Sequence, residues 1–118
     1  MVNDVPLAYR ALTGEDPAVL WERVKEALSQ DYTTVGGMQS LVDQVAKTTL
    51  FMRLVIDPAR VAIKDVYVTQ GSQLFYGDTS RDFCEKISNL VTDGWKLVGE
   101  PVLYFQSGKP AIRQMLCR

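Results

Sequence analysis

The chain contains 118 residues, of which 47% are apolar and 23% are charged, a balance typical of one globular domain. Thirteen basic residues nearly cancel fourteen acidic ones, and histidine is absent. The lack of histidine excludes a Ser-His-Asp triad, a Cys-His pair and a histidine-bearing zinc site. Cys84 and Cys117 are too few for a four-thiolate metal site. We interpret them as free thiols, although their spacing also permits a disulfide between them.

The sequence predicts no export signal and no membrane span. The N-terminus has no basic region followed by an apolar stretch. The longest apolar run, Thr49–Ile56, is interrupted by Arg53 and is shorter than the roughly 20 residues that cross a bilayer. We therefore expect a cytoplasmic protein without contact to membranes, and we expect neither a metal nor a cofactor.

The first half of the chain is predicted to form a strand, a helix and two further strands. Asp16 can accept hydrogen bonds at the start of the helix, and Pro17 suits its first position. An apolar stripe at helical spacing continues to about Gln30. Met38–Ala46 is ambiguous because its apolar residues also fit a helical turn. The predicted strands are Leu7–Leu12, Tyr32–Val35 and Lys47–Ile56.

The segment Asp57–Arg60 breaks the chain and is predicted to link two halves, residues 1–56 and 61–118. In the second half a helix is capped by Asp78, Thr79 or Ser80, continues to about Asp93 and stops at Gly94. The predicted strands of this half are Val61–Thr69, Gln73–Tyr76, Trp95–Val98, Val102–Phe105 and Ala111–Cys117, the last two forming a hairpin around Gln106–Lys109.

A faint internal repeat relates the two halves. A shift of 63 positions aligns Tyr9–Gly36 with Ser72–Gly99 without a gap, and four of the 28 aligned positions are identical. The apolar positions of the two helices and the glycines that flank them also correspond. We predict an α+β fold in which two pseudo-symmetric β-α-β-β halves pack two amphipathic helices on an antiparallel sheet. Each half is too small for a core of its own, so residues 1–118 should form one compact domain.

Two motifs resemble a small bacterial and phage family that carries a domain of unknown function. The first runs from Tyr9 through Thr13-Gly14 and a helix to Tyr32 and Gly36. The second contains Gly94-Trp95, Gly99 and a last strand with Gln114. Asp31 departs from the family pattern, which has a glycine before the aromatic residue. The second half also lacks the tyrosine and Thr-Gly opening. The resemblance implies a small α+β module from a phage or a bacterium, and together with the repeat it suggests two diverged copies of that module.

Four residues are candidates for binding a ligand or partner. Tyr32 and Trp95 follow the two helices and could stack on a planar ligand, or pack into the core. Gln114 shares a strand face with apolar neighbours, so its carboxamide needs either a structural bond or a ligand. Arg113 lies beside it in a basic C-terminal stretch. No phosphate-binding glycine loop occurs.

Two alternatives remain open. Single-stranded nucleic acid could bind a sheet surface that combines basic and aromatic residues; the candidates are Lys96, Tyr104, Phe105, Lys109 and Arg113. An enzyme would have to rely on carboxylates, lysine or tyrosine; the candidates are Glu22, Glu85, Lys86 and Tyr32. Nothing in the sequence brings these last groups together.

We therefore expect a non-catalytic binding protein that contacts a protein partner or sequesters a small ligand. A phage-encoded protein that acts on a component of its bacterial host would fit this description. Sheet edges are common sites of self-association, so we also expect a homo-oligomer.

Overall fold

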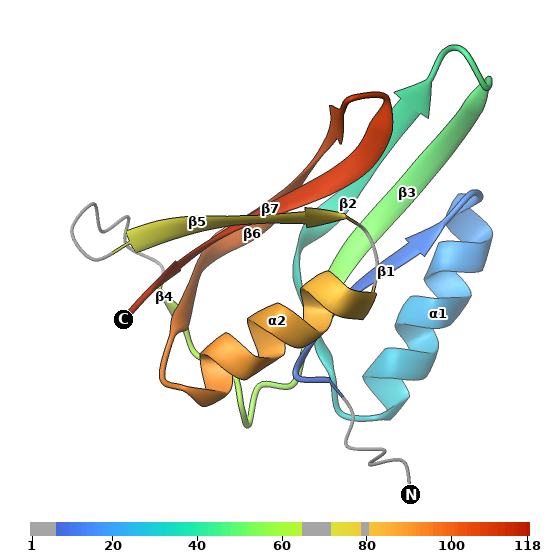
Figure 1. Cartoon of the computed structure of the whole chain (residues 1–118). Coiled ribbons are helices and arrows are strands. Elements are labelled where there is room, and N and C mark those ends of the chain that lie inside the picture. The colour runs from blue at the N-terminus through green and yellow to red at the C-terminus, as the bar shows by residue number, and fades with distance from the viewer. Residues whose placement is uncertain (1–6, 65–71, 79–80) are drawn as a thin grey trace, which may run out of the picture.

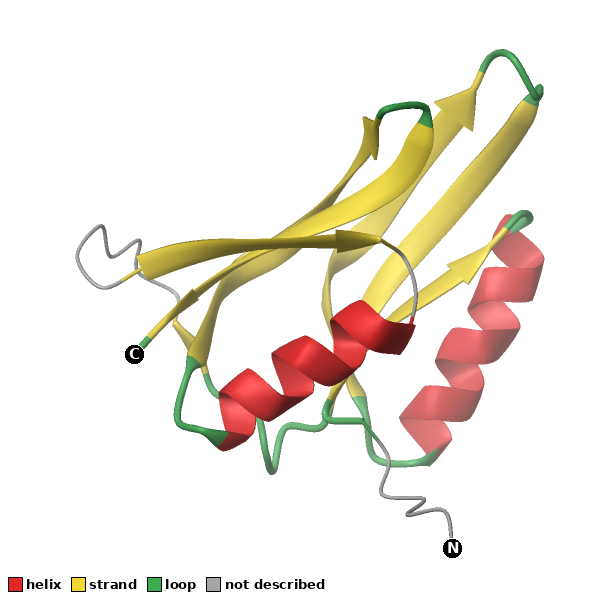
Figure 2. Ribbon diagram, in the orientation of Figure 1, coloured by secondary structure: helices red, strands yellow, loops and turns green. Residues whose placement is uncertain are grey.

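The computed structural model describes residues 7–64, 72–78 and 81–118 (Figure 1). Within these ranges the chain forms two helices and seven strands (Figure 2). In chain order they are β1 (Tyr9–Gly14), α1 (Pro17–Ser29), β2 (Thr33–Asp43), β3 (Thr48–Ile56), β4 (Ile63–Lys64), β5 (Ser72–Asp78), α2 (Arg81–Thr92), β6 (Lys96–Gln106) and β7 (Lys109–Cys117).

Helix α1 begins and ends where the sequence predicts. The Asp16 carboxylate accepts a hydrogen bond from the Ala18 amide at 2.7 Å, and Pro17 occupies the first turn, where no intrahelical acceptor exists for an amide hydrogen. At the other end the Gln30 amide donates to the Ala27 carbonyl at 2.9 Å. The buried stripe of Leu20, Val24 and Ala27 faces the first three strands.

Strands β2 and β3 form a long hairpin in the first half. The helical alternative for Met38–Ala46 is wrong, because β2 resumes its pairing with β3 after a bulge and continues to Asp43. The Asp43 carboxylate then accepts hydrogen bonds from the amides of Val45 and Ala46 and fixes the turn. Local apolar spacing could not separate these alternatives, since a short apolar segment fits both periods.

The region between the halves differs from its prediction. The expected strand Val61–Thr69 is represented by β4, which pairs in parallel with β6 over two residues. Residues 65–69 of that prediction lie outside the described residues, as do the predicted helix caps Thr79 and Ser80. Helix α2 ends at Thr92, and Gly94 has a φ of 101°, which favours glycine as the stop residue.

Strand β6 is longer than predicted because it joins two segments that the sequence separates. A bulge between Val98 and Val102 interrupts its register with β7 without ending the strand. Ser107 and Gly108, with φ values of 53° and 76°, form the tight turn into β7. Two positive φ values are typical of hairpin turns whose twist matches that of the flanking strands.

The same topology occurs twice. One sheet, called sheet A, has the order β1-β3-β2; the second, sheet B, has the order β4-β6-β7-β5. Apart from β4, sheet B repeats the order of sheet A, and each three-strand unit is antiparallel. The bulges also correspond, with Gly36 at φ 72° and Gly99 at φ 71°. The predicted α+β fold with two pseudo-symmetric halves is confirmed.

Two apolar clusters hold these layers together. The smaller one lies between α1 and one face of sheet A; its buried members are Leu12, Leu20, Val24, Ala27, Tyr32 and Val55. The larger one combines sheet A, α2 and sheet B; its members include Tyr9, Met52, Leu54, Ile56, Phe83, Ile87, Val91, Leu97, Ile112 and Leu116. Helix α2 therefore contributes to a core that belongs to both halves, whereas α1 packs on the strands of its own half.

The two bulges lie beside each other, where β2 approaches β6. The Gln39 carboxamide donates to the Pro101 carbonyl and accepts from the Leu103 amide at 2.8 Å. The Gly37 amide donates to the Glu100 carboxylate at 3.2 Å. These bonds join the two sheets without continuous strand pairing.

Candidate binding surface

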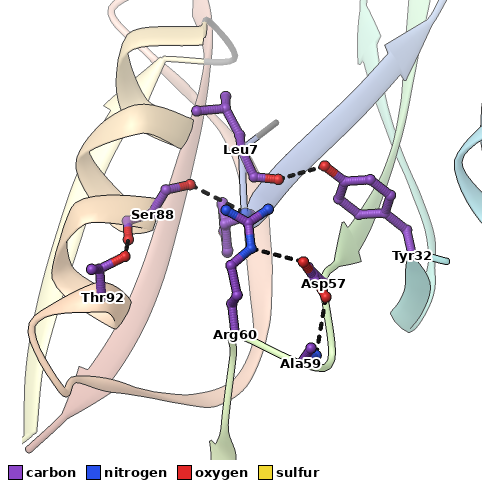
Figure 3. A network of polar contacts seen from close by, with 8 residues as sticks. Leu7, Tyr32, Asp57, Ala59, Arg60, Ser88 and Thr92 are labelled. Carbon is purple, nitrogen blue, oxygen red and sulfur yellow. Dashed lines mark hydrogen bonds and ion pairs between the residues drawn. The ribbon is translucent and has the colours of Figure 1, made fainter. Parts of the chain in front are cut away.

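Tyr32 lies in the core beneath α1 and does not present a stacking platform. Only 7% of its surface is exposed. Its hydroxyl donates to the Leu7 carbonyl at 2.6 Å (Figure 3), and the Arg10 guanidinium lies 5.2 Å from its ring centroid. The ring therefore covers the end of the first half's core.

Trp95 occupies the equivalent place in the second half and is only partly buried. Its ring meets Phe75 edge-on, with 5.6 Å between the ring centroids. The Arg118 guanidinium lies 5.0 Å from the Trp95 centroid, a separation at which a cation is attracted to the ring face. Phe75 and Arg118 thus take up contacts that a stacked ligand would need.

Gln114 is fully buried and its carboxamide is bonded within the protein. Its oxygen accepts from the Tyr9 hydroxyl at 3.0 Å, and its nitrogen donates to the carbonyls of Gly99 at 3.1 Å and Met115 at 3.0 Å. The bond to Tyr9 joins the two halves. The arrangement accounts for a polar residue on an apolar strand face.

Arg113 and Tyr104 lie together on the opposite face of the same sheet. The Arg113 guanidinium is 5.5 Å from the Tyr104 ring centroid. Strand alternation points Ile112 and Leu116 into the core, so their neighbours point outward. We call this side the outer face of sheet B; it carries Leu74, Tyr76, Val102, Tyr104, Arg113 and Met115.

The outer face combines aromatic, aliphatic and cationic side chains that solvent can reach. Tyr76 is 55% exposed and Val102 is 40% exposed. Both are register partners of Arg113, one on each neighbouring strand. Sequence reasoning identified Arg113 but missed Tyr76 and Val102. Phe75 points inward, so strand alternation could have indicated that Tyr76 points outward. The same reasoning fails for Val102, because the bulge in β6 changes the side to which residues after it point.

The remaining basic and aromatic candidates are divided between surfaces. Alternation places Lys96 on the side of the outer face, near the other end of β6. Lys109 is exposed at the tip of the β6–β7 hairpin, opposite Gln106. Phe105 is 38% exposed and lies on the opposite side of β6 from Tyr104. Only part of the predicted nucleic-acid set therefore shares one surface.

The groups considered for catalysis are divided between the two halves, with Glu22 and Tyr32 in the first and Glu85 and Lys86 together on α2. On α1, Glu22 pairs with Lys25 at 2.8 Å, and on α2, Glu85 pairs with Arg81 at 2.9 Å. The Lys86 ammonium lies 5.5 Å from the Phe75 ring centroid. Tyr32 belongs to the core beneath α1. Within the described residues, Glu85 and Lys86 line one open groove on α2, while Glu22 and Tyr32 lie elsewhere.

A polar network at the junction of the halves is structural (Figure 3). The Asp57 carboxylate accepts from the Arg60 guanidinium at 2.7 Å and from the Ala59 amide at 3.0 Å. The bond from Arg60, opposed in part by burial, holds the pKa of Asp57 below its ordinary value. Nearby, the Ser88 hydroxyl accepts from the Tyr9 amide at 3.2 Å and so connects α2 to β1.

Tyr9 is a strongly perturbed titratable group in the core. Burial raises the pKa of its hydroxyl well above the ordinary tyrosine value, with a further contribution from Cys84. The hydroxyl is enclosed by core side chains, including Phe83 with ring centroids 6.2 Å apart. Cys84 and Cys117 are buried free thiols, which confirms their predicted state.

Two open grooves occur on the surface of the described residues. One, of about 410 Å³, runs along α2 and is lined by Asp82, Glu85, Lys86, Asn89, Leu90 and Asp93. The other, of about 500 Å³, lies at the N-terminal end of α1 beside Thr13, Gly14 and Arg23. Neither encloses the mostly apolar volume that small-molecule sites usually provide. Neither described helix is long and apolar enough to cross a membrane.

Part of the second half matches a known family model. Residues 73–116 match the family model of a domain of unknown function, DUF1737. The resemblance to a small domain-of-unknown-function family is thereby confirmed for this part of the chain. The DUF1737 match extends from β5 to β7 and does not include the first half. No curated protein and no solved structure matches the chain.

Proposed function

We propose that this chain is a non-catalytic interaction protein that binds another protein through the outer face of sheet B. The observation that carries this proposal is the cross-strand row of Tyr76, Arg113 and Val102, with Tyr104 stacked against Arg113. Tyrosine and arginine are enriched among the residues that dominate protein interfaces. Their long side chains provide a large contact area around a charge that a partner can pair.

The asymmetry between the two sheets supports the same surface. Sheet A is covered by α1 on one face and by the shared core on the other. In sheet B, α2 and the shared core cover the inner face, while Tyr76 and Val102 on the other face are exposed. A surface of this kind, rimmed by polar residues, is typical of an interaction site.

The resemblance to bacterial and phage proteins directs the search for the partner to a bacterial cytoplasm. The test compares three purified forms in capture from bacterial lysate: the unmodified chain, Arg113→Ser and the control Trp21→Ser. Trp21 is 50% exposed on α1, far from sheet B. We expect a discrete protein to be retained by the unmodified chain and the control and lost with Arg113→Ser. Equal retention by all three forms would refute the proposed surface.

Single-stranded nucleic acid is the second candidate, because Lys96, Tyr104 and Arg113 share one side of sheet B. Stacking on Tyr104 would be combined with phosphate contacts from the two cations. Against it, acidic residues outnumber basic residues by one in the whole chain, and phosphate affinity depends chiefly on lysine and arginine. Fluorescence anisotropy with a labelled oligonucleotide at two salt concentrations decides between the candidates; no binding at low salt excludes nucleic acid.

Sequestration of a small ligand has less support than either macromolecule. The two grooves are open, and the one on α2 is lined mainly by charged residues. Native mass spectrometry of gently purified protein tests this version directly. A reproducible extra mass would favour a ligand, whereas the mass of the bare chain or its multiples would favour protein contact.

A further inference from the structure

The first strands of the two halves, β1 and β5, are equivalent edge strands whose surroundings differ. Among the residues that the structure describes, β1 pairs only with β3, and β5 pairs only with β7. The outward backbone of β1 is closed by α2: the Tyr9 amide donates to the Ser88 hydroxyl at 3.2 Å, and the Ala11 amide donates to the Cys84 sulfur at 3.3 Å. Sheet A is therefore protected at this edge by a helix of the other half.

The corresponding backbone groups of β5 also point away from their sheet. The Leu97 amide donates to the Ala62 carbonyl at 2.9 Å, so Leu97 faces β4 and its neighbour Lys96 faces β7. Lys96 and Ser72 are the register partners of Cys117 on its two sides. Because antiparallel pairs alternate, Cys117 bonds toward β6. The backbone groups of Leu74 and Tyr76 are consequently directed to the free edge.

Nothing in the described part of the chain closes this edge. Among the described residues, none forms a hydrogen bond with the outward backbone groups of Leu74 or Tyr76. Helix α1 packs on sheet A, so it does not cover the outward backbone of β5 in the way that α2 covers that of β1. The edge of sheet B thus offers amide and carbonyl groups to another strand.

β5 also lacks the features that usually prevent edge pairing. Its sequence, Ser-Gln-Leu-Phe-Tyr-Gly-Asp, contains no lysine, arginine or proline, and its pairing with β7 has no bulge. By contrast, β2 carries the Gly36 bulge and bonds to β6 through Gln39. Native edge strands are normally interrupted by such charges, prolines or bulges.

The exposed edge is complementary to itself. If two β5 strands meet antiparallel about a two-fold axis at Phe75, Leu74 of each copy lies opposite Tyr76 of the other. In this register the outward amides and carbonyls of both residues find partners. The apolar Leu74 side chain would cover Tyr76, which is 55% exposed in the single chain. Cross-strand pairs of aliphatic and aromatic residues are favourable.

We infer that the free β5 edge, which adjoins the outer face of sheet B, binds a second copy of the chain through antiparallel pairing of the two β5 strands. The result is one continuous sheet with the order β4-β6-β7-β5-β5-β7-β6-β4 and an isologous two-fold interface. This inference goes beyond the proposed function, because pairing at the edge leaves Arg113 and Val102 on the outer face free to contact another protein. The near-zero net charge of the chain leaves little repulsion between two copies.

The test begins with the mass in solution. Sedimentation equilibrium of the unmodified chain should give twice 13.2 kDa. Tyr76→Lys places a charge beside the edge, and Leu74→Pro removes an outward amide that β7 does not use. Both variants should be monomers with an unchanged circular dichroism spectrum. Tyr104→Lys, which adds the same charge on β6, should remain dimeric.

Cross-linking tests the register independently of variant stability. Leu74→Cys and Tyr76→Cys, mixed and gently oxidised, should form a disulfide between the two variants in preference to linking either variant with itself. Paired residues in an antiparallel ladder lie about 5.5 Å apart between Cα atoms, which a disulfide can span. Cys84 and Cys117 are buried and serve as the unreactive background.

The outcomes separate this inference from the proposed function. A monomeric unmodified chain, a dimer that survives Tyr76→Lys and Leu74→Pro, or cross-linking without preference would overturn β5 pairing. If the chain is monomeric but captures a protein that Arg113→Ser loses, the proposed function stands and the second copy is wrong. If the chain is monomeric and only an oligonucleotide binds, both fail.

Discussion

At the scale of single residues, the bond between Tyr9 and Gln114 is a buried side-chain contact that joins the halves. Its partners are 105 positions apart in the chain, and both side chains are fully buried. A buried polar group that loses its partner destabilises a fold more than a satisfied pair stabilises it. The pair therefore favours the native arrangement of the halves over other apolar packings.

Replacing Gln114 should show how much an unpaired buried polar group destabilises the fold. We expect Gln114→Met to lower the free energy of unfolding by about 1–3 kcal/mol, because the Tyr9 hydroxyl is left buried without an acceptor. In Tyr9→Phe/Gln114→Met the hydroxyl is absent as well, so the double variant should be more stable than the sum of the single effects by at least about 0.5 kcal/mol. Urea unfolding of the four proteins measures the difference. If the effects of the two single substitutions simply add, the Tyr9–Gln114 bond does not contribute to stability.

Tyr9 should also make stability fall in alkali. Burial, followed by Cys84, raises the pKa of Tyr9 in the folded state well above the ordinary value, which is about 10. Above pH 10 the unfolded chain loses this proton before the folded chain does, so the free energy of unfolding decreases as the pH rises. Tyr9→Phe should show a smaller decrease between pH 9 and pH 11. Parallel curves for the two proteins would contradict this prediction.

At the scale of elements, the two bulges have the same backbone conformation and different surroundings. Gly36 and Gly99 have nearly equal positive φ values. A Cβ atom on Gly36 would overlap the Glu100 side chain, whereas one on Gly99 would meet nothing within 4 Å. Gly36 is thus required for conformation and for close approach, and Gly99 for conformation alone.

The matched pair Gly36→Ala and Gly99→Ala tests this distinction. A left-handed conformation costs a residue with a Cβ about 1–2 kcal/mol, which we expect for Gly99→Ala. Gly36→Ala should destabilise the protein by more, since the Glu100 side chain must also move. Thermal or urea unfolding provides both values. When Glu100→Ala is the background, the excess should shrink; an excess that persists would assign it to another cause.

At the scale of the whole molecule, the shared core leads us to expect that the two halves fold as one unit. The larger cluster takes buried side chains from both sheets and from α2, and α2 bonds to the edge of the first half. Opening the contact between the halves would expose apolar surface on both sides. Contiguous packing of this kind favours a single cooperative transition.

The two tryptophans report on different halves and can test this cooperativity. Trp21 belongs to α1, while Trp95 packs on Phe75 in the second half. In Trp95→Phe and Trp21→Phe the remaining tryptophan should follow urea unfolding with the same midpoint that circular dichroism gives for that variant. Midpoints that differ between fluorescence and circular dichroism would indicate that the halves unfold separately.

The local elements of this fold were predictable because short-range chemistry determines them. Asp16 and Pro17 mark the start of α1, and the alternation in Lys47–Ile56 identifies β3. The continuation of β2 beyond Gly36 was not predictable, since it depends on pairing with β3 rather than on its own period. A strand was predicted around β4, but its parallel pairing with β6 depends on a contact between distant segments that no local pattern encodes.

The candidate surface was predictable only in part, for the same reason. A basic and aromatic C-terminal stretch is visible in the sequence, and the structure brings Arg113 and Tyr104 together. The contribution of Tyr76 depends on the register between β5 and β7, which couples segments far apart in the chain. Gln114 shows the converse, because its unusual position reflects a bond to Tyr9 that no local pattern encodes.

The Cys84 sulfur sits at the seam between the halves, where it accepts the Ala11 amide. A thiol-specific reagent can reach it only when α2 moves away from β1, whereas Cys117 on β7 becomes reachable when sheet B itself loosens. Their labelling rates under native conditions therefore report the rates of two separate opening motions. If Cys84 reacts first, α2 separates from β1 while sheet B stays folded, and the protein opens locally along the boundary between its two similar halves.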